Sequence, residues 1–393
     1  MAVAASNARG ETESGLLPLR VVQNQLLDES GKHVHLTGVN RSGTEYACIQ
    51  GWGIFDGPSD DASVAAIASW GSNAVRIGLN EDCWLGVNQV PQQYSGASYI
   101  RAITGYVQLL HSHGIYAVLA LMWAAPGDNK ATWQEAMADA DHALAFWVSV
   151  AATFRDDKTT LFELYGEPSW ISWPCWADGC DYSDKYGTWR TAGMRQMLNS
   201  VRGAGAHNVV LVSGNDYAND LGSWLAYAPQ DADHQLVASF HLYGNNTCGD
   251  VPCWDSSVKE VAKRVPLVTA ELGERADGSS CGHEFVDRYL GYARSNGLSY
   301  LAWTWNTWNP CSVLIRDFDG TPTPFGAAYR SQLQSGRPFA TLPYAESWPS
   351  RPLFEIPREL RHERILFGFA IIFGLGVLTG GAWFRFRRRR APA

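Results

Sequence analysis

The sequence predicts an α/β protein: a (β/α)8 TIM barrel followed by a C-terminal transmembrane helix. Three observations predict it. Short apolar segments alternate with longer amphipathic stretches from about Val34 onward, and polar residues lie at the ends of those apolar segments. Near the C-terminus, an uncharged apolar run has the roughly twenty residues that a membrane-spanning helix needs. A doubly wound parallel sheet is the alternative that this alternation leaves open.

Composition narrows the functional class. The chain has 393 residues, of which 46% are hydrophobic and 18% charged, and its formal net charge is -8. These values fit one large globular domain with additional segments and exclude a disordered protein. Lys and Arg form no stripe in the main body, so nucleic acid is not an expected partner. The 17 Trp exceed ordinary usage and serve either as core residues or as stacking surfaces for sugar rings.

The predicted strands are nearly continuous apolar runs of the kind that parallel sheets bury. They cover residues 33–40, 73–79, 116–123, 161–168, 208–214, 236–244, 266–273 and 299–306. The stretches between them, such as 62–71 and 98–114, have helical character and end in glycine, as helices often do. In a barrel of this class the active site lies at the C-terminal ends of the strands, so the residues there are the functional candidates.

Two carboxylates end predicted strands. Glu167 lies at the end of the fourth strand and Glu271 at the end of the seventh. Glycoside hydrolysis needs such a pair, because one carboxyl protonates the leaving oxygen while the other attacks the anomeric carbon. A surface ion pair is the alternative for either glutamate taken singly. Two glutamates at matching strand ends favour the catalytic interpretation.

Four further residues lie at or near strand ends. Arg76 can keep the nucleophile ionised, and Trp303 can form the floor of a sugar site. His241 and Tyr243 point to the same side of one strand. A buried strand histidine is more often a core residue, so His241 counts only as part of the group. We expect this chemistry to need no metal and no organic cofactor.

From about Val34 to Tyr329 the sequence resembles glycoside hydrolase family 5, the cellulase-type retaining hydrolases. The resemblance rests on LTGVNRSGTEYACIQGWGIFDGP, AVRIGLNEDCWLG, MWAAPG, YGEPSW, FHLYG, VTAELGE and AWTWN. It implies that Glu167 is the acid/base and Glu271 the nucleophile. It also implies that the substrate-binding residues are Arg76, Trp123, His241, Tyr243 and Trp303.

Two positions depart from the family pattern. The family's N-E-P motif is Gly166-Glu167-Pro168 here, and its L-H-W motif is Leu121-Met122-Trp123. The missing Asn would bond the sugar hydroxyl next to the reacting carbon, and the missing His would support the same subsite. The expected function is retaining, endoglucanase-like cleavage of a β-linked glucan or related glycan. A transglycosylase and a catalytically impaired carbohydrate-binding protein are the alternatives.

The 8 Cys form an even set, which predicts disulfides in a chain outside the cytosol. Two C-x4-C pairs can also be halves of a zinc site, but neither has a His at ligand spacing. Neighbouring loops on one barrel face can be joined pairwise. The predicted bridges are Cys48–Cys83, Cys175–Cys180, Cys248–Cys253 and Cys281–Cys311.

The predicted organisation places a barrel between terminal segments. These are an N-terminal extension (1–33), the hydrolase domain (34–330), a linker (331–364), a transmembrane helix (365–384) and a basic cytoplasmic tail (385–393). The positive-inside rule and the cysteines place the catalytic domain outside the cytoplasm, although arginines also precede the apolar run. A buried soluble helix is the alternative for that run. The first twenty or so residues lack the pattern of a signal peptide, which leaves the export route open.

Overall fold

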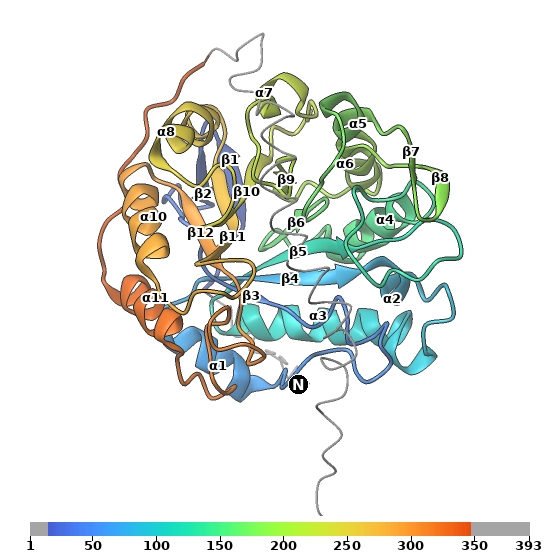
Figure 1. Cartoon of the computed structure of the whole chain (residues 1–393), viewed down its shortest axis with the longest axis horizontal. Helices are drawn as coiled ribbons and strands as arrows, with labels where there is room; N and C mark the ends of the chain where they lie inside the picture. The colour runs from blue at the N-terminus through green and yellow to red at the C-terminus, as the bar shows by residue number, and fades with distance from the viewer. Residues whose placement is uncertain (1–14, 347–393) are drawn as a thin grey trace, which may run out of the picture. The chain divides into compact units, whose positions relative to one another are not determined.

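The computed structural model describes residues 15–346, and its centre is a closed barrel of parallel strands (Figure 1). Around the barrel the strand order is β10-β11-β12-β3-β4-β5-β6-β9. The strands are β3 (Thr37–Arg41), β4 (Ala74–Asn80), β5 (Tyr116–Trp123), β6 (Thr160–Glu163), β9 (Val210–Ser213), β10 (Leu236–Tyr243), β11 (Leu267–Gly273) and β12 (Ser299–Ala302). Each overlaps a predicted strand segment. The predicted barrel is therefore confirmed, and the doubly wound alternative is wrong.

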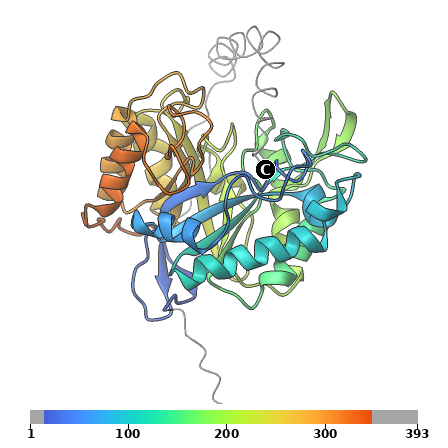
Figure 2. The ribbon, with the colours of Figure 1, turned by 90° about the horizontal axis from the view of Figure 1, so that it is seen from below.

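Helices surround the strands, as Figure 1 and the view turned by 90° in Figure 2 show. They are α1 (Asp61–Ser69), α2 (Glu81–Leu85), α3 (Ala97–Ser112), α4 (Ala143–Phe154), α5 (Trp173–Asp178), α6 (Met194–Gly203), α7 (Trp224–Tyr227), α8 (Val251–Cys253), α9 (Lys259–Ala262), α10 (Glu284–Ser295) and α11 (Pro324–Gln334). A 3-10 turn, η1 (Gln92–Tyr94), and a π-helical segment, η2 (Trp254–Val258), complete the helical elements. The predicted helices at 62–71 and 98–114 correspond to α1 and α3.

The core has two layers because strand side chains alternate between the inside and the outside of the barrel. The smaller cluster contains an apolar residue from each barrel strand or from the residues just before it, including Val118, Leu211 and Leu301. The larger cluster lies between the strands and the helices. The hairpin of β1 (Leu19–Val22) and β2 (Gln25–Asp28) adds Leu19 and Leu26 to the inner cluster. A second hairpin, β7 (Asp181–Asp184) with β8 (Gly187–Arg190), is separate from the barrel sheet.

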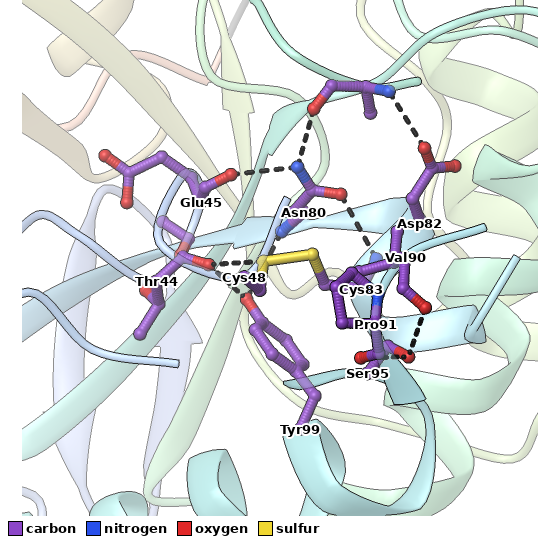
Figure 3. Close-up of a disulfide and its surroundings, with 12 residues drawn as sticks. Thr44, Glu45, Cys48, Asn80, Asp82, Cys83, Val90, Pro91, Ser95 and Tyr99 are labelled. Atoms are coloured by element: carbon purple, nitrogen blue, oxygen red, sulfur yellow. Dashed lines mark hydrogen bonds between the residues drawn. A yellow bond between two sulfur atoms is a disulfide. The ribbon is translucent and has the colours of Figure 1, made fainter. Parts of the chain in front are cut away.

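All four predicted disulfides are present, and the described residues contain no free cysteine. Cys48–Cys83 joins the segment after β3 to α2, which follows β4 (Figure 3). Cys281–Cys311 joins the segments after β11 and β12 in the same way. The two C-x4-C pairs are disulfides, so the zinc interpretation of these cysteines is wrong. The bridges fasten the loops at the C-terminal end of the barrel.

The predicted membrane span lies outside the described residues. Within residues 15–346, no helix has the length and apolar character to cross a bilayer. Residues 365–384 and the basic tail belong to the part of the chain that the structure does not describe, so the anchor stays a prediction.

Candidate active site

Glu167 and Glu271 meet at the C-terminal end of the barrel. One carboxylate oxygen of each lies within 4.8 Å of the other, and a ring nitrogen of His241 lies within the same distance of both. The sequence places Glu167 on the fourth strand, but that strand, β6, already ends at Glu163. Glu167 therefore belongs to the segment that follows the strand. Its side chain is 17% exposed, so substrate can reach it.

Glu271 reaches the inside of the barrel because β11 contains an irregularity. Val268 and Ala270 belong to the inner cluster, whereas Thr269 bonds Tyr289 on α10. Strict alternation would direct Glu271 outward, like Thr269. In the pairing with β10, Thr269 lies opposite Phe240 and Glu271 lies opposite His241, so Ala270 is an extra residue. This bulge turns Glu271 toward the active site.

Arg76 and Tyr243 hold Glu271. The Arg76 guanidinium donates from Nη1 to Glu271 Oε1 at 2.8 Å and to Asn40 Oδ1 at 2.9 Å. Tyr243 donates its hydroxyl to Glu271 Oε2 at 2.7 Å. A buried cation and a phenol therefore each donate to one oxygen of this carboxylate and hold it in place. The arrangement suits a nucleophile.

Glu167 has an environment of the opposite kind. Burial, and then the neighbouring charge of Glu271, raise the pKa of Glu167. A raised pKa keeps a carboxyl group protonated closer to neutral pH, as a general acid requires. The two glutamates therefore lie in different environments: Arg76 and Tyr243 bond Glu271, whereas burial and the Glu271 charge raise the pKa of Glu167.

His241 lies between these carboxylates. Its Nδ1 is 3.0 Å from Glu167 Oε1 and 3.6 Å from Glu271 Oε1. Burial by itself would lower the pKa of His241, but the Glu271 charge, the nearby Glu163 carboxylate and a hydrogen bond to Glu167 raise it to about 9. The imidazolium form partly offsets the negative charge of the site.

Comparison with known proteins places this chain in a family. The family model described as "Cellulase (glycosyl hydrolase family 5)" matches residues 27–309. The chain belongs to glycoside hydrolase family 5. The resemblance seen in the sequence is therefore confirmed, and the protein is a glycoside hydrolase.

Two relatives come from Streptomyces lividans. A mannan endo-1,4-beta-mannosidase is 24% identical over 311 residues, which cover 77% of this chain and 70% of the relative. Endoglucanase CelA is 25% identical over 342 residues, which cover 82% of this chain and 65% of the relative.

Solved structures of other enzymes share the fold. A beta-glucanase from Saccharophagus degradans has a TM-score of 0.64 at 18% identity, covering 85% of this chain and 98% of that one. The catalytic domain of an endoglucanase from Thermobifida fusca has a TM-score of 0.61 at 17% identity, covering 81% and 97%. Each has also been solved in complex with cellotetraose. At these identities the structures show the barrel fold alone.

The two departures from the family pattern contact each other. A Cβ atom placed on Gly166 would lie 2.6 Å from Met122 Sδ and 3.2 Å from Arg76 Nη2. The thioether also accepts a hydrogen bond from Arg76 Nη2 at 3.2 Å. The Met122 sulfur therefore occupies the space in which a side chain at 166 would begin, and the two departures form a matched pair.

Gln134 is a site residue that the sequence did not indicate. With its amide oriented to satisfy both partners, Gln134 Nε2 donates to Glu167 Oε2 at 2.9 Å and Oε1 accepts from the Glu167 backbone N–H at 3.1 Å. Gln134 lies between β5 and α4, where no motif marks it. Its amide is also 3.3 Å from the Cβ position at Gly166. An amide from a neighbouring loop thus reaches the region where the family's Asn is absent.

Glu163 is a second site residue that the sequence motifs did not indicate. A charged residue inside an apolar strand could have indicated it. It is fully buried and pairs with Arg76 Nε, and it accepts from the Ser239 hydroxyl. Burial alone would raise the pKa of Glu163, but the Arg76 charge, the nearby His241 imidazolium and a hydrogen bond from Ser239 lower it to about 2. Glu163 fixes Arg76 from the side opposite Glu271.

The two predicted tryptophans belong to an aromatic rim. The Trp123 ring lies 6.0 Å from the Tyr46 ring and 6.5 Å from that of Trp133, and Trp303 lies 6.3 Å from Trp308. Several rim residues in loops after the barrel strands are between 42% and 65% exposed: Trp52, Trp133, Trp170 and Trp308. Exposed aromatic rings at a barrel mouth offer stacking surfaces for sugars.

Proposed function

We propose that this family 5 enzyme is a retaining endo-β-glycosidase that cleaves β-1,4-linked glucan or a related glycan such as mannan. Glu167 is the acid/base and Glu271 the nucleophile. The observation that carries the proposal is the spacing of less than 4.8 Å between a Glu167 and a Glu271 oxygen. Retaining enzymes hold their carboxyl groups about 5–5.5 Å apart, whereas inverting enzymes need about 6.5–9.5 Å to admit a water molecule.

The reaction runs in two displacements. Glu271 attacks the anomeric carbon and forms a glycosyl ester while the Glu167 proton passes to the leaving glycosidic oxygen. Glu167, now a carboxylate, then removes a proton from water, whose oxygen attacks the same carbon and releases Glu271. Arg76 and Tyr243 hold the nucleophile in place before attack and stabilise its charge on release.

The substrate class draws support from two sources. The relatives are named as endoglucanases, a mannosidase and a beta-glucanase, and two were solved with cellotetraose. The aromatic rim supports binding of an extended chain of sugars, because successive rings can stack on separate tryptophans. Trp123 and Trp303 flank the catalytic group as substrate-binding residues in this proposal.

The test combines variants with product stereochemistry. Glu271→Gln should abolish turnover of β-1,4-glucan and mannan, because no other group forms the glycosyl ester. Glu167→Gln should lose least activity on aryl glycosides whose leaving group needs no protonation. Glu260→Gln on α9 is the matched control and should retain full activity. Inverted product detected by NMR, or turnover by Glu271→Gln, would refute the mechanism.

We also propose that the catalytic domain lies outside the cytoplasm, anchored by residues 365–384. Its four disulfides support this placement, because reducing compartments do not maintain such bonds. Protease added to intact cells that express the full chain should release an active domain containing all four bridges. Free thiols in a protease-protected domain would contradict the placement.

A further inference from the structure

A second group of ionisable side chains lies apart from the catalytic pair. Glu81 is the first residue of α2, directly after β4, while Asp139 and His142 lie in the loop that leads into α4. Glu81 and Asp139 are 0% and 1% exposed. Each of the three side chains offers one ligand-type atom, and these atoms lie within 4.8 Å of one another. The hydrolytic mechanism uses none of them.

Each of these side chains has an atom without a hydrogen-bond partner among residues 15–346. These atoms are Glu81 Oε2, Asp139 Oδ2 and His142 Nδ1. The other carboxylate oxygens are engaged: Glu81 Oε1 accepts from Ala125 N, and Asp139 Oδ1 accepts from His142 N, both at 2.7 Å. Two adjacent buried carboxylates without compensation are costly, so the group requires a shared proton or a cation.

We propose that Glu81, Asp139 and His142 bind one divalent metal ion of the zinc or manganese type as a structural site. A proton shared by the two carboxyl groups would satisfy their oxygens, but the imidazole would keep only its ion pair with Asp139, in which His142 Nδ1 lies 3.5 Å from Oδ1. A divalent ion uses all three atoms, and its charge balances the two carboxylates. Mixed oxygen and nitrogen donors suit Zn²⁺ or Mn²⁺, whereas Ca²⁺ and Mg²⁺ prefer oxygen ligands alone.

The metal would fasten the loop that supports the catalytic acid. Segment 124–142 carries Gln134, which bonds Glu167. The middle of this segment is tied to the start of α2, because Asn80 Nδ2 donates to Ala131 O at 2.7 Å and Asp82 Oδ2 accepts from Ala131 N at 2.8 Å. Figure 3 shows Asn80 and Asp82 beside the disulfide-bonded Cys83. A metal at Glu81 and Asp139 would tie the end of the segment to the same helix.

Metal binding can be measured independently of hydrolysis. Untagged full-length protein, dialysed against EDTA and then against buffer, is titrated with ZnCl2, MnCl2, CaCl2 or MgCl2 by calorimetry. We expect one equivalent of Zn²⁺ or Mn²⁺ to bind. At a free metal concentration of 100 times Kd, Tm should rise by roughly 3–6 °C. Absence of stoichiometric binding of either ion to the wild-type protein would overturn the proposal.

Variants separate a metal from a shared proton. Asp139→Asn and His142→Ala should abolish the stoichiometric binding, and the half-buried control His113→Ala, which lies in an ion pair with Asp61, should retain it. Glu81→Gln should lose both the binding and the metal-dependent rise in Tm. The proposal is wrong if the Tm of Glu81→Gln equals or exceeds that of the wild type both with and without metal. In that case the Glu81 and Asp139 carboxyl groups share a proton.

A kinetic measurement tests the link to the active site. Removing the metal should lower kcat in the wild type, and adding it back should restore kcat. In Gln134→Ala the metal should still bind and still raise Tm, but it should no longer change kcat. A metal effect on kcat that is unchanged in Gln134→Ala would show that the loop does not transmit it.

Discussion

Restoring the family's residues at 166 and 122 tests whether this site is an adapted version of the usual one. A side chain at 166 begins 2.6 Å from Met122 Sδ, which is far below normal contact distance. Gly166→Asn alone should therefore displace Met122 and cost about 1–3 kcal/mol of stability through overpacking. It should also disturb the contact between Met122 and Arg76, so little rate should be gained.

The double variant Gly166→Asn/Met122→His should behave differently. Replacing the thioether removes the clash, and the Asn amide becomes free to bond the sugar hydroxyl at the 2-position. A hydrogen bond of this kind contributes about 1–2 kcal/mol, which corresponds to roughly 5- to 30-fold in kcat/KM. The double-mutant cycle should show a coupling energy of about 1–3 kcal/mol, because the two side chains touch.

The assay measures kcat, KM and Tm for the wild type, both single variants and the double variant on a β-1,4-linked tetrasaccharide. Met122→Leu controls for loss of the sulfur at similar volume. A 2-deoxy substrate should show no gain, because it lacks the hydroxyl. Effects that add to within about 0.5 kcal/mol, or a gain that persists on the 2-deoxy substrate, would refute the reasoning.

Three further predictions concern the buried charges around the pair. Glu163→Gln should lower the free energy of unfolding by about 3–5 kcal/mol, because it leaves the buried Arg76 guanidinium without one partner. Urea denaturation measures this change. The exposed control Asp178→Asn should lower the free energy of unfolding by less than about 1 kcal/mol. The pKa of His241 is raised to about 9, so its stabilising effect is full below about pH 6.5 and is lost as the pH rises through 9. The Tm difference between wild type and His241→Gln should therefore shrink from pH 6 to pH 10, and a constant difference would contradict the assignment. Gln134→Ala removes a donor to the Glu167 carboxylate, so it should lower kcat more than it changes KM. Because the lost donor favours the charged form, its removal should raise the pKa of Glu167 and shift the alkaline limb of the pH profile of kcat to higher pH. An unchanged limb would exclude that contact.

The pattern of apolar and polar residues along the sequence was sufficient to predict much of the fold. The sequence contains eight apolar runs that are too short to be buried helices, and helical stretches separate them. Few arrangements other than a closed parallel barrel bury eight such strands. The disulfide pairing followed from that topology, since cysteines in adjacent loops such as Cys48 and Cys83 come within bonding distance once the barrel closes. That His241 and Tyr243 point to the same side of β10 followed from strand periodicity in the same way, whereas Arg76 lies near the start of β4 and not at its end.

The sequence by itself determined the barrel, the location of the mouth and the chemical types gathered there, because strand periodicity and strand ends are properties of contiguous residues. The orientation of Glu271 depended on the bulge at Ala270, which arises only from the pairing of β10 with β11. The Gln134 contact and the Met122 sulfur at Gly166 likewise join segments that no local pattern relates. Side chains from separate loops meet only after the backbone has closed, so the tertiary structure alone decided how Glu167 is supported.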